Sequence, residues 1–147
     1  MDSIAMNGTY PGIVGFWGTG GYDWMIEFDN YVASPVFNLV MYTSSSSQRA
    51  GAPQNPSATP LAINTWYHIV VTASSTEGKK IYLNGTLETT NANTSGLLNN
   101  YSDDNRIGSS RWGSTTDWDG KIDQLRFYDG VLTATQVTEL YNEVVCN

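Results

Sequence analysis

The stretch NTWYHIVVTASSTEGKKIYLNGTLETT, Asn64–Thr90, decides the fold. Aromatic and β-branched residues fill Trp66–Thr72, which is the composition of a pleated, half-buried strand. Lys80–Leu83 follows a polar turn, and Asn84-Gly85 then predicts a two-residue hairpin, because a type I′ turn needs a positive φ at both central residues. Thr86–Thr90 is the returning strand. The stretch therefore predicts three antiparallel strands joined in a meander.

Strand-like segments also lie on both sides of this meander, separated by turn-rich sequence. The expected strands outside the meander are Gly12–Trp17, Tyr22–Phe28, Val36–Thr43, Arg106–Gly108 and Asp119–Tyr128. Gly15, inside the first of them, predicts a bulge or a close backbone approach. Residues 44–60 have no apolar period and predict a long loop, or a loop with a short edge strand. Many short strands separated by turns predict an all-β sandwich of two antiparallel sheets.

Only the end of the chain has a helical pattern. Thr133 and Gln136 form a capping box, in which each side chain satisfies a backbone amide of the other residue. Apolar residues then recur at helical spacing, at Val137, Leu140, Tyr141 and Val144. A helix this short is marginal in water by itself, so we expect it to pack on the sandwich.

The acidic composition excludes several kinds of partner. The 147 residues carry 7 basic and 14 acidic side chains, a formal charge of −7, which opposes binding to nucleic acid or to an anionic membrane surface.

Cys146 is the only cysteine, so neither an intrachain disulfide nor a Cys-x-x-Cys zinc site can form. No stretch reaches the ~20 apolar residues of a membrane span, and no cleavable signal pattern opens the chain. We expect a single domain, residues 1–147, that reaches the outside of a cell within something larger or by lysis.

Two groups of motifs resemble one known family of domains. Residues 64–72 with Ile81–Gly85 resemble the WhHvAvt…lYvdG segment of laminin-G-like, concanavalin A-like jelly-roll domains. Arg106–Gly108 followed by Trp118–Tyr128 resembles that family's closing riG…f.G.IDevriYn signature. Val137–Tyr141 resembles its final short helix. The resemblance implies a two-sheet antiparallel jelly-roll sandwich with a short C-terminal helix.

The two ends of the resemblance carry further expectations. The closing residues Leu140–Glu143 are similar to those of domains appended to tail and other structural proteins of marine bacteriophages. The resemblance covers the chain from about Gly12 onward, whereas the family starts with two strands, one of them an fTisaWv segment, that nothing before Gly12 matches. We therefore expect the chain to be the C-terminal part of a longer protein, or a partner to supply the missing strands. An uncovered sheet edge also predicts a homo-oligomer or a larger assembly.

The enzymes of this superfamily offer a direct comparison. A glycoside hydrolase of this fold is expected to carry Glu-x-Asp-x-x-Glu on one strand, with two carboxylates facing each other across the cleft. Glu27 and Asp29 start that pattern here, but Val32 stands where the second glutamate belongs. Retaining chemistry needs two carboxylates about 5–5.5 Å apart, so we expect no enzyme. We interpret Glu27 and Asp29 as carboxylates on an exposed strand face or in a turn.

His68 is the only histidine of the chain, which excludes a two-histidine metal site. It alternates with Trp66 and Val70 on one face of the expected strand. It also matches a position that is commonly histidine in the resembled family. We interpret His68 as a satisfied sheet residue rather than as a metal ligand or a catalytic base.

Calcium is a candidate cofactor that the resemblance implies. Laminin-G-like domains often hold one Ca²⁺ at the rim of the sandwich with carboxylates and backbone carbonyls, the ligands that a hard cation prefers. Two acidic loops supply such groups, Asp104 in one and Asp117 and Asp119 in the other. Asp and Asn also favour turns through local hydrogen bonds, so the alternative role of these residues is structural.

An exposed aromatic side chain in a polar loop favours sugar binding, because a flat ring can lie against the C–H groups of a pyranose. Trp112 lies beside Arg111 in a Ser/Thr/Gly-rich loop and matches no core position of the resembled family. Tyr101 and Trp17 are further candidates of the same kind. By the resemblance, the aromatic residues expected in the core are Trp66, Tyr82 and Trp118.

These observations predict a carbohydrate-binding or adhesion module without catalytic activity, displayed on a phage virion or a secreted particle. Its expected partner is a glycan or a host-surface polysaccharide, and its expected location is the virion surface or the extracellular space. The alternative is a structural subunit of a virion, used for decoration, fibre or assembly and without a glycan ligand. A glycoside hydrolase is a distant third alternative.

Overall fold

The computed structural model describes residues 11–18, 21–29, 38–43, 49–50, 64–94, 104–109 and 117–143. For residues 17–18, 21–24, 28–29, 38–43 and 49–50 it describes the backbone alone. The elements of the described chain are β1 (Gly12–Gly18), β2 (Gly21–Asp29), β3 (Asn38–Thr43), β4 (Arg49–Ala50), β5 (Ile69–Ser74), β6 (Gly78–Leu83), β7 (Thr86–Asn91), β8 (Asp104–Ile107) and α1 (Ala134–Tyr141).

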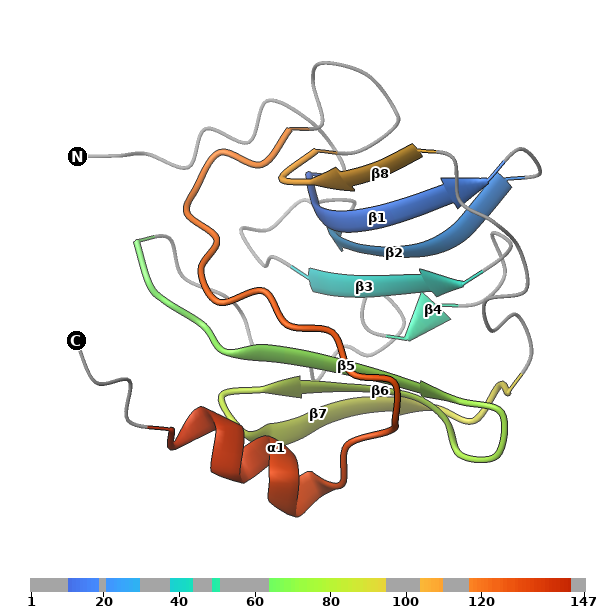
Figure 1. Ribbon diagram of the computed structural model, residues 1–147, viewed down its shortest axis with the longest axis vertical. Helices are drawn as coiled ribbons and strands as arrows, with labels where there is room; N and C mark the ends of the chain where they lie inside the picture. The colour runs from blue at the N-terminus through green and yellow to red at the C-terminus, as the bar shows by residue number, and fades with distance from the viewer. Residues whose placement is uncertain are drawn as a thin grey trace.

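The strands form two antiparallel sheets that face each other, with α1 beside β7 (Figure 1). One sheet has the strand order β4-β3-β2-β1-β8, and the other has the order β5-β6-β7. Segment 117–133 runs from the β8 side of the sandwich to the start of α1 (Figure 1). The predicted all-β sandwich with a short C-terminal helix is confirmed, and so is the short edge strand in the loop that follows β3.

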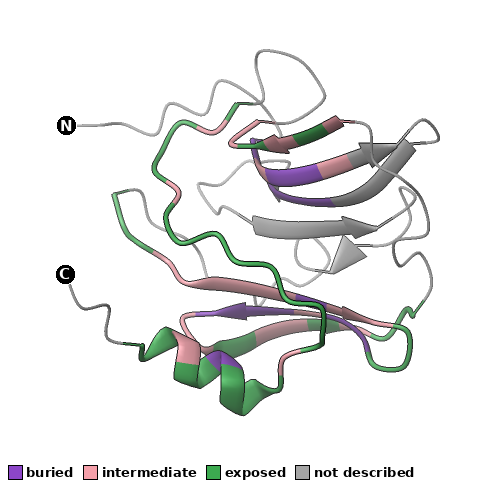
Figure 2. Cartoon of the chain, viewed as in Figure 1, coloured by how far each residue is buried: buried purple, intermediate pink, exposed green. Residues whose placement is uncertain are grey.

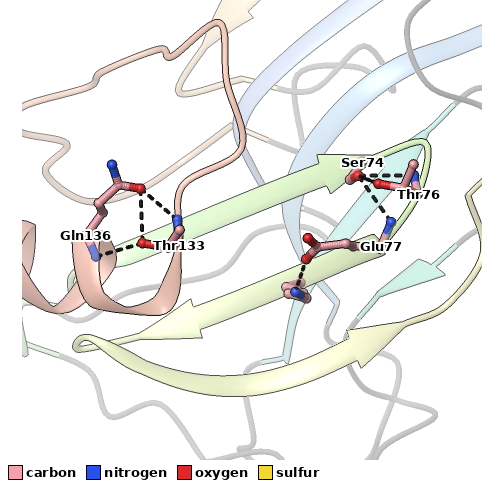
Figure 3. Close-up of polar contacts among 6 residues, drawn as sticks. Ser74, Thr76, Glu77, Thr133 and Gln136 are labelled. Atoms are coloured by element: carbon pink, nitrogen blue, oxygen red, sulfur yellow. Dashed lines mark hydrogen bonds and ion pairs between the residues drawn. The ribbon is translucent and has the colours of Figure 1, made fainter.

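The turns of the meander have the geometry that the sequence predicts. Asn84 and Gly85 have φ angles of 50° and 78°, and Leu83 pairs with Thr86 across this two-residue hairpin. In the turn between β5 and β6, the Ser74 hydroxyl accepts hydrogen bonds from the amides of Thr76 and Glu77, each at 3.1 Å (Figure 3). These hydrogen bonds satisfy backbone amides that lie outside the pairing of β5 with β6.

The core lies between the two sheets. Val14 and Ile26 of the larger sheet contact Ile81 and Leu83 of β6, and each of the four is less than 9% exposed. The alternate residues of β5 also pack against them, namely Ile69, Val71 and Ala73. Figure 2 shows buried positions on β1, β2, β5 and β6, and one on α1. Two register shifts in β1, one on each side of Gly15, bear out the predicted irregularity of that strand.

A lysine lies at one end of this apolar inner face. Lys79 is opposite Ala73 in the ladder and is fully buried. Its Nζ donates a hydrogen bond to the carbonyl of Asn93 at 3.0 Å. Burial lowers the pKa of Lys79, because desolvation disfavours the charged form. The sequence analysis gave no role to this residue, whose alternation with Ile81 and Leu83 places it on the core face.

The C-terminal helix begins as predicted. The Thr133 hydroxyl accepts from the amide of Gln136 at 3.3 Å, and the Gln136 side chain accepts from the amide of Thr133 at 2.9 Å (Figure 3). Val137 is fully buried and anchors the apolar stripe. The Thr138 hydroxyl donates to the carbonyl of Gly85 at 3.2 Å, so the helix is also hydrogen-bonded to the β6–β7 hairpin.

Two strand predictions were wrong. The first meander strand begins at Ile69 rather than at Trp66. The expected strand Asp119–Tyr128 is not a strand, because Gln124 has a φ of 50°. The backbone amide of Gln124 donates a hydrogen bond to Asp123 Oδ1 at 2.8 Å. A left-handed residue turns an extended chain away from a ladder.

The one helix found among the described residues is too short to cross a membrane.

Candidate functional site

The predicted sugar-binding residues fall largely outside the described residues. Trp112, Arg111 and Tyr101 lie in stretches that the structure does not describe. Trp17 is in β1, where only its backbone is described, opposite Tyr22 on one side and Asp104 on the other. The aromatic loop around Trp112 therefore stays a prediction.

Two of the three predicted calcium ligands, Asp104 and Asp117, are engaged by other side chains. Both carboxylate oxygens of Asp104 accept from Arg106, at 2.9 Å from Nε and 2.8 Å from Nη2. Asp117 accepts from the Ser109 hydroxyl at 2.6 Å, and Asp119 is exposed. Asp104 chiefly, and the charge of Asp117 as well, raise the pKa of Arg106.

The described parts of the two acidic loops bring no group of carboxylates together. Ca²⁺ takes six to eight oxygen ligands, whereas within the described residues no three His, Cys, Asp or Glu side chains gather at one point. The cation beside Asp104 is the guanidinium of Arg106, in the bidentate geometry that suits a carboxylate. Arg106 thus balances the charge of Asp104.

The acid that starts the hydrolase-like pattern is buried, contrary to the prediction of an exposed or turn carboxylate. Glu27 is 2% exposed, and Met25, on the same face of β2, is 1% exposed. Ile26, on the other face, belongs to the core between the sheets, so both faces of β2 are covered here. The side chain of Asp29 is not described.

The core tryptophan assignment was wrong for one residue and correct for another. Trp66 is 64% exposed, because β5 starts only at Ile69 and Trp66 precedes the ladder. Tyr67 packs against the core in its place. Trp118 packs against the core cluster as predicted, and Tyr82 is buried at 3% exposure.

His68 lies just before β5, half-buried, and is only partly satisfied. Its amide donates to Asn84 Oδ1 at 3.0 Å, and its carbonyl accepts from the amide of Asn84 at 2.8 Å. Its Nδ1 is buried without a hydrogen-bond partner in the described chain. Burial first, and the charge of Arg126 second, lower the pKa of His68. The prediction of a satisfied residue therefore holds for the backbone and not for the ring.

One group of exposed polar and aromatic side chains was missed by the sequence analysis. It comprises Gln124, Arg126, Tyr128, Tyr141 and Glu143, which we call the Arg126 cluster. Arg126 Nη1 donates to Glu143 Oε2 at 2.6 Å, and its Nη2 donates to Gln124 Oε1 at 3.0 Å. A hydrogen bond to Glu143 and, next in size, one to Tyr128 raise the pKa of Arg126. Arg126 lowers the pKa of Glu143 in turn.

Two separate parts of the chain build this cluster. Gln124 and Tyr128 both interact with the Arg126 side chain, so segment 117–133 brings these three side chains together. Phe127, between Arg126 and Tyr128 in the sequence, packs edge-on against Phe16 at 5.6 Å between ring centroids. The end of α1 supplies Tyr141 and Glu143. The alternation in Asp123–Tyr128 could have revealed the first three residues.

The inner side of the cluster rests on the β6–β7 hairpin. The Tyr141 ring lies 5.7 Å from the His68 ring, centroid to centroid, and it packs against Gly85. The outer side is accessible: Tyr128 and Tyr141 are 49% and 47% exposed. The cluster thus combines a paired cation and anion, an amide and two aromatic rings on a supported surface.

Comparison with known proteins identifies a family for nearly the whole chain. Residues 5–138 match the family model described as the concanavalin A-like lectin/glucanases superfamily, a laminin-G-like model. This match begins upstream of Gly12, where we had expected the resemblance to start. No curated protein and no solved structure matches the chain.

Proposed function

The chain belongs to the concanavalin A-like lectin/glucanases superfamily, and we propose that it is a carbohydrate-binding module without catalytic activity. The family includes both lectins and sugar-cleaving enzymes, so membership alone does not decide between them. The observation that carries the proposal is the Arg126 cluster, which joins hydrogen-bonding groups to exposed tyrosine rings. Such a combination suits a ligand that has both hydroxyl groups and C–H faces.

The sequence and the burial of Glu27 support the absence of catalysis. Glycoside hydrolysis uses two carboxylates that flank the scissile bond. Val32 occupies the position of the second glutamate, and Glu27 is only 2% exposed. A buried carboxylate on a covered strand face has no access to a sugar chain.

We further propose that the module is displayed in several copies on a virion or another extracellular particle. This proposal is supported by the similarity of Leu140–Glu143 to the endings of domains in phage structural proteins. Several copies on one particle would turn weak binding at each site into strong attachment. A homo-oligomer or larger assembly is therefore part of the proposal.

A glycan array probed with the multimerised protein, once with calcium and once with EDTA, tests the proposed function. We expect binding to a defined set of glycans that persists in EDTA, because Arg106 already balances the Asp104 carboxylate. Trp112→Ala, on the same array, tests whether the predicted loop contributes. No binding under either condition would contradict the proposal and favour an architectural subunit.

A further inference from the structure

We propose that the Arg126 cluster is a binding site for a neutral sugar residue, recognised through a pair of adjacent hydroxyl groups. The inference rests on the carbohydrate-binding function proposed above and gives it a location and a ligand class. Its basis is the set of polar atoms that the cluster presents, together with the half-exposed rings of Tyr128 and Tyr141.

Several polar atoms of the cluster remain free for a ligand. Arg126 uses two N–H groups on Glu143 and Gln124 and contacts Tyr128, which leaves further N–H donors on its guanidinium. In the part of the chain that the structure describes, Glu143 Oε1 and the Gln124 amide nitrogen have no hydrogen-bond partner. The free groups are thus donors and an acceptor placed side by side.

This mixture of groups matches hydroxyls better than ions. A hydroxyl both donates and accepts, so one of two adjacent hydroxyls can donate to Glu143 while its neighbour accepts from Arg126. A phosphate or a carboxylate offers acceptors only and would be repelled by Glu143. A cation would be repelled by Arg126. The formal charge of −7 on the chain further disfavours an anionic glycan.

The aromatic rings supply the apolar contact that a pyranose needs. Tyr128 interacts with Arg126, and Tyr141 lies two residues before Glu143 in the chain; both tyrosine rings are half-exposed. The Tyr141 side chain packs against Gly85, and its ring lies 5.7 Å from the His68 ring, centroid to centroid. A ring fixed in this way loses little conformational entropy when a ligand covers it.

A purely structural role explains the cluster less completely. Val137 and the Thr138–Gly85 hydrogen bond already attach α1 to the hairpin. The Arg126–Glu143 pair is 41% and 46% exposed at its two side chains, and exposed ion pairs contribute little to stability. Attachment of the helix therefore does not require the hydrogen bonds of Arg126 with Glu143 and Gln124.

Binding of matched variants to an array of neutral and anionic oligosaccharides tests the inference. The neutral set contains glucose-, galactose- and mannose-based chains, and the anionic set contains uronic acid, sialylated and sulfated chains. Arg126→Met keeps the aliphatic stem and removes the donors, and Tyr128→Ala removes one ring. Lys80→Met is the matched control, because it breaks another surface ion pair, that of Lys80 with Glu77.

We expect the wild-type protein and Lys80→Met to bind the same neutral glycans with affinities within about twofold. Arg126→Met and Tyr128→Ala should each weaken that binding by at least about tenfold, the effect of ~1.4 kcal/mol. Melting temperatures of all variants, measured in parallel, show that each one is folded. The inference requires that Tyr128→Ala loses binding while its melting temperature stays close to that of the wild type.

The outcomes that overturn this inference differ from those that overturn the proposed function. If the wild type binds glycans and both cluster variants bind equally well, the site lies elsewhere and the proposed function stands. Loss of binding in Trp112→Ala alone would place it in the predicted loop. A wild-type preference for anionic glycans would also contradict the inference. If the wild type binds no glycan, the proposed function itself fails.

Discussion

Tyr141 packs directly on Gly85: a Cβ atom placed on Gly85 would lie 3.1 Å from Cδ1 and 3.2 Å from Cβ of Tyr141. Gly85 also has a φ of 78°, in the left-handed region. The residue that the Asn84-Gly85 hairpin needs is therefore also the residue that lets the end of α1 approach the sheet. One glycine links the meander, the helix and the Arg126 cluster.

Gly85→Ala is expected to destabilise the fold by about 2 kcal/mol, from the left-handed backbone and the crowding of Tyr141 together. Urea unfolding measures this loss. Gly130→Ala is the matched control, because a Cβ there meets nothing within 4 Å and its φ is not left-handed. The control should change stability by less than about 0.5 kcal/mol. Equal stability of the two variants would contradict the described contact.

Val137→Ala is expected to destabilise the protein by about 2 kcal/mol, because it removes two fully buried methyl groups and leaves a cavity under α1. Thr135→Ala, at an exposed position of the same helix, should leave stability unchanged or slightly raised. Thermal unfolding followed by circular dichroism compares the two variants. A Val137→Ala protein as stable as Thr135→Ala would show that the helix does not pack as described.

Stability should fall as the pH falls through the range in which histidines titrate. The pKa of His68 is lowered from 6.5, so the unfolded chain takes up this proton at a higher pH than the folded chain does. Below about pH 6.5 the unfolded state therefore binds more protons and gains free energy relative to the folded state. The positive charge of Arg126 adds to the effect of burial on this pKa, and the Tyr141 ring lies 5.7 Å from the His68 ring, centroid to centroid.

His68→Phe removes the titrating group and keeps a ring against Tyr141. The urea midpoint of the wild type should drop between pH 7.5 and pH 5.5, and that of His68→Phe should drop less. Carboxyl groups contribute little to this comparison, because they titrate mostly below that interval. Identical drops in both proteins would assign the pH dependence to other groups.

Calcium and EDTA should leave the melting temperature of the wild-type protein unchanged. The reason is that Arg106 holds both oxygens of Asp104 and lies close enough to Asp117 to be affected by its charge. Arg106→Ala should lower stability only slightly, as expected for a partly exposed ion pair. A clear rise in melting temperature on addition of calcium to the wild type would contradict this account and restore the predicted metal site.

Local signals in the sequence were sufficient for much of the fold. The Asn84-Gly85 hairpin and the Thr133–Gln136 capping box were predicted correctly, because each depends on residues adjacent in the chain. The predicted strand Asp119–Tyr128 was wrong. Its sequence alternates as a strand does, but Gln124 adopts a left-handed conformation that the residue types of this motif do not indicate. The exposure of Trp66 follows from where β5 starts, and strand ends are poorly determined by composition.

The site was less predictable than the fold. The Arg126 cluster joins segment 117–133 to the end of α1, so no local pattern contains it. Burial of Glu27 likewise depends on what covers the outer face of β2. The ion pair of Asp104 with Arg106 is likewise revealed only by three-dimensional proximity, and the calcium site stays a prediction. The loop around Trp112 remains a sequence prediction.

Titration of the ¹⁵N-labelled protein with a soluble neutral oligosaccharide selected from the array tests the central claim most directly. Amide shifts in two-dimensional NMR spectra report both whether a sugar binds and where. The account predicts saturable shifts concentrated at residues 124–128 and 141–143, with β4 and the Ser74–Gly78 turn unaffected. Spectra that do not change with any array-positive sugar, or that change only far from the Arg126 cluster, would contradict it.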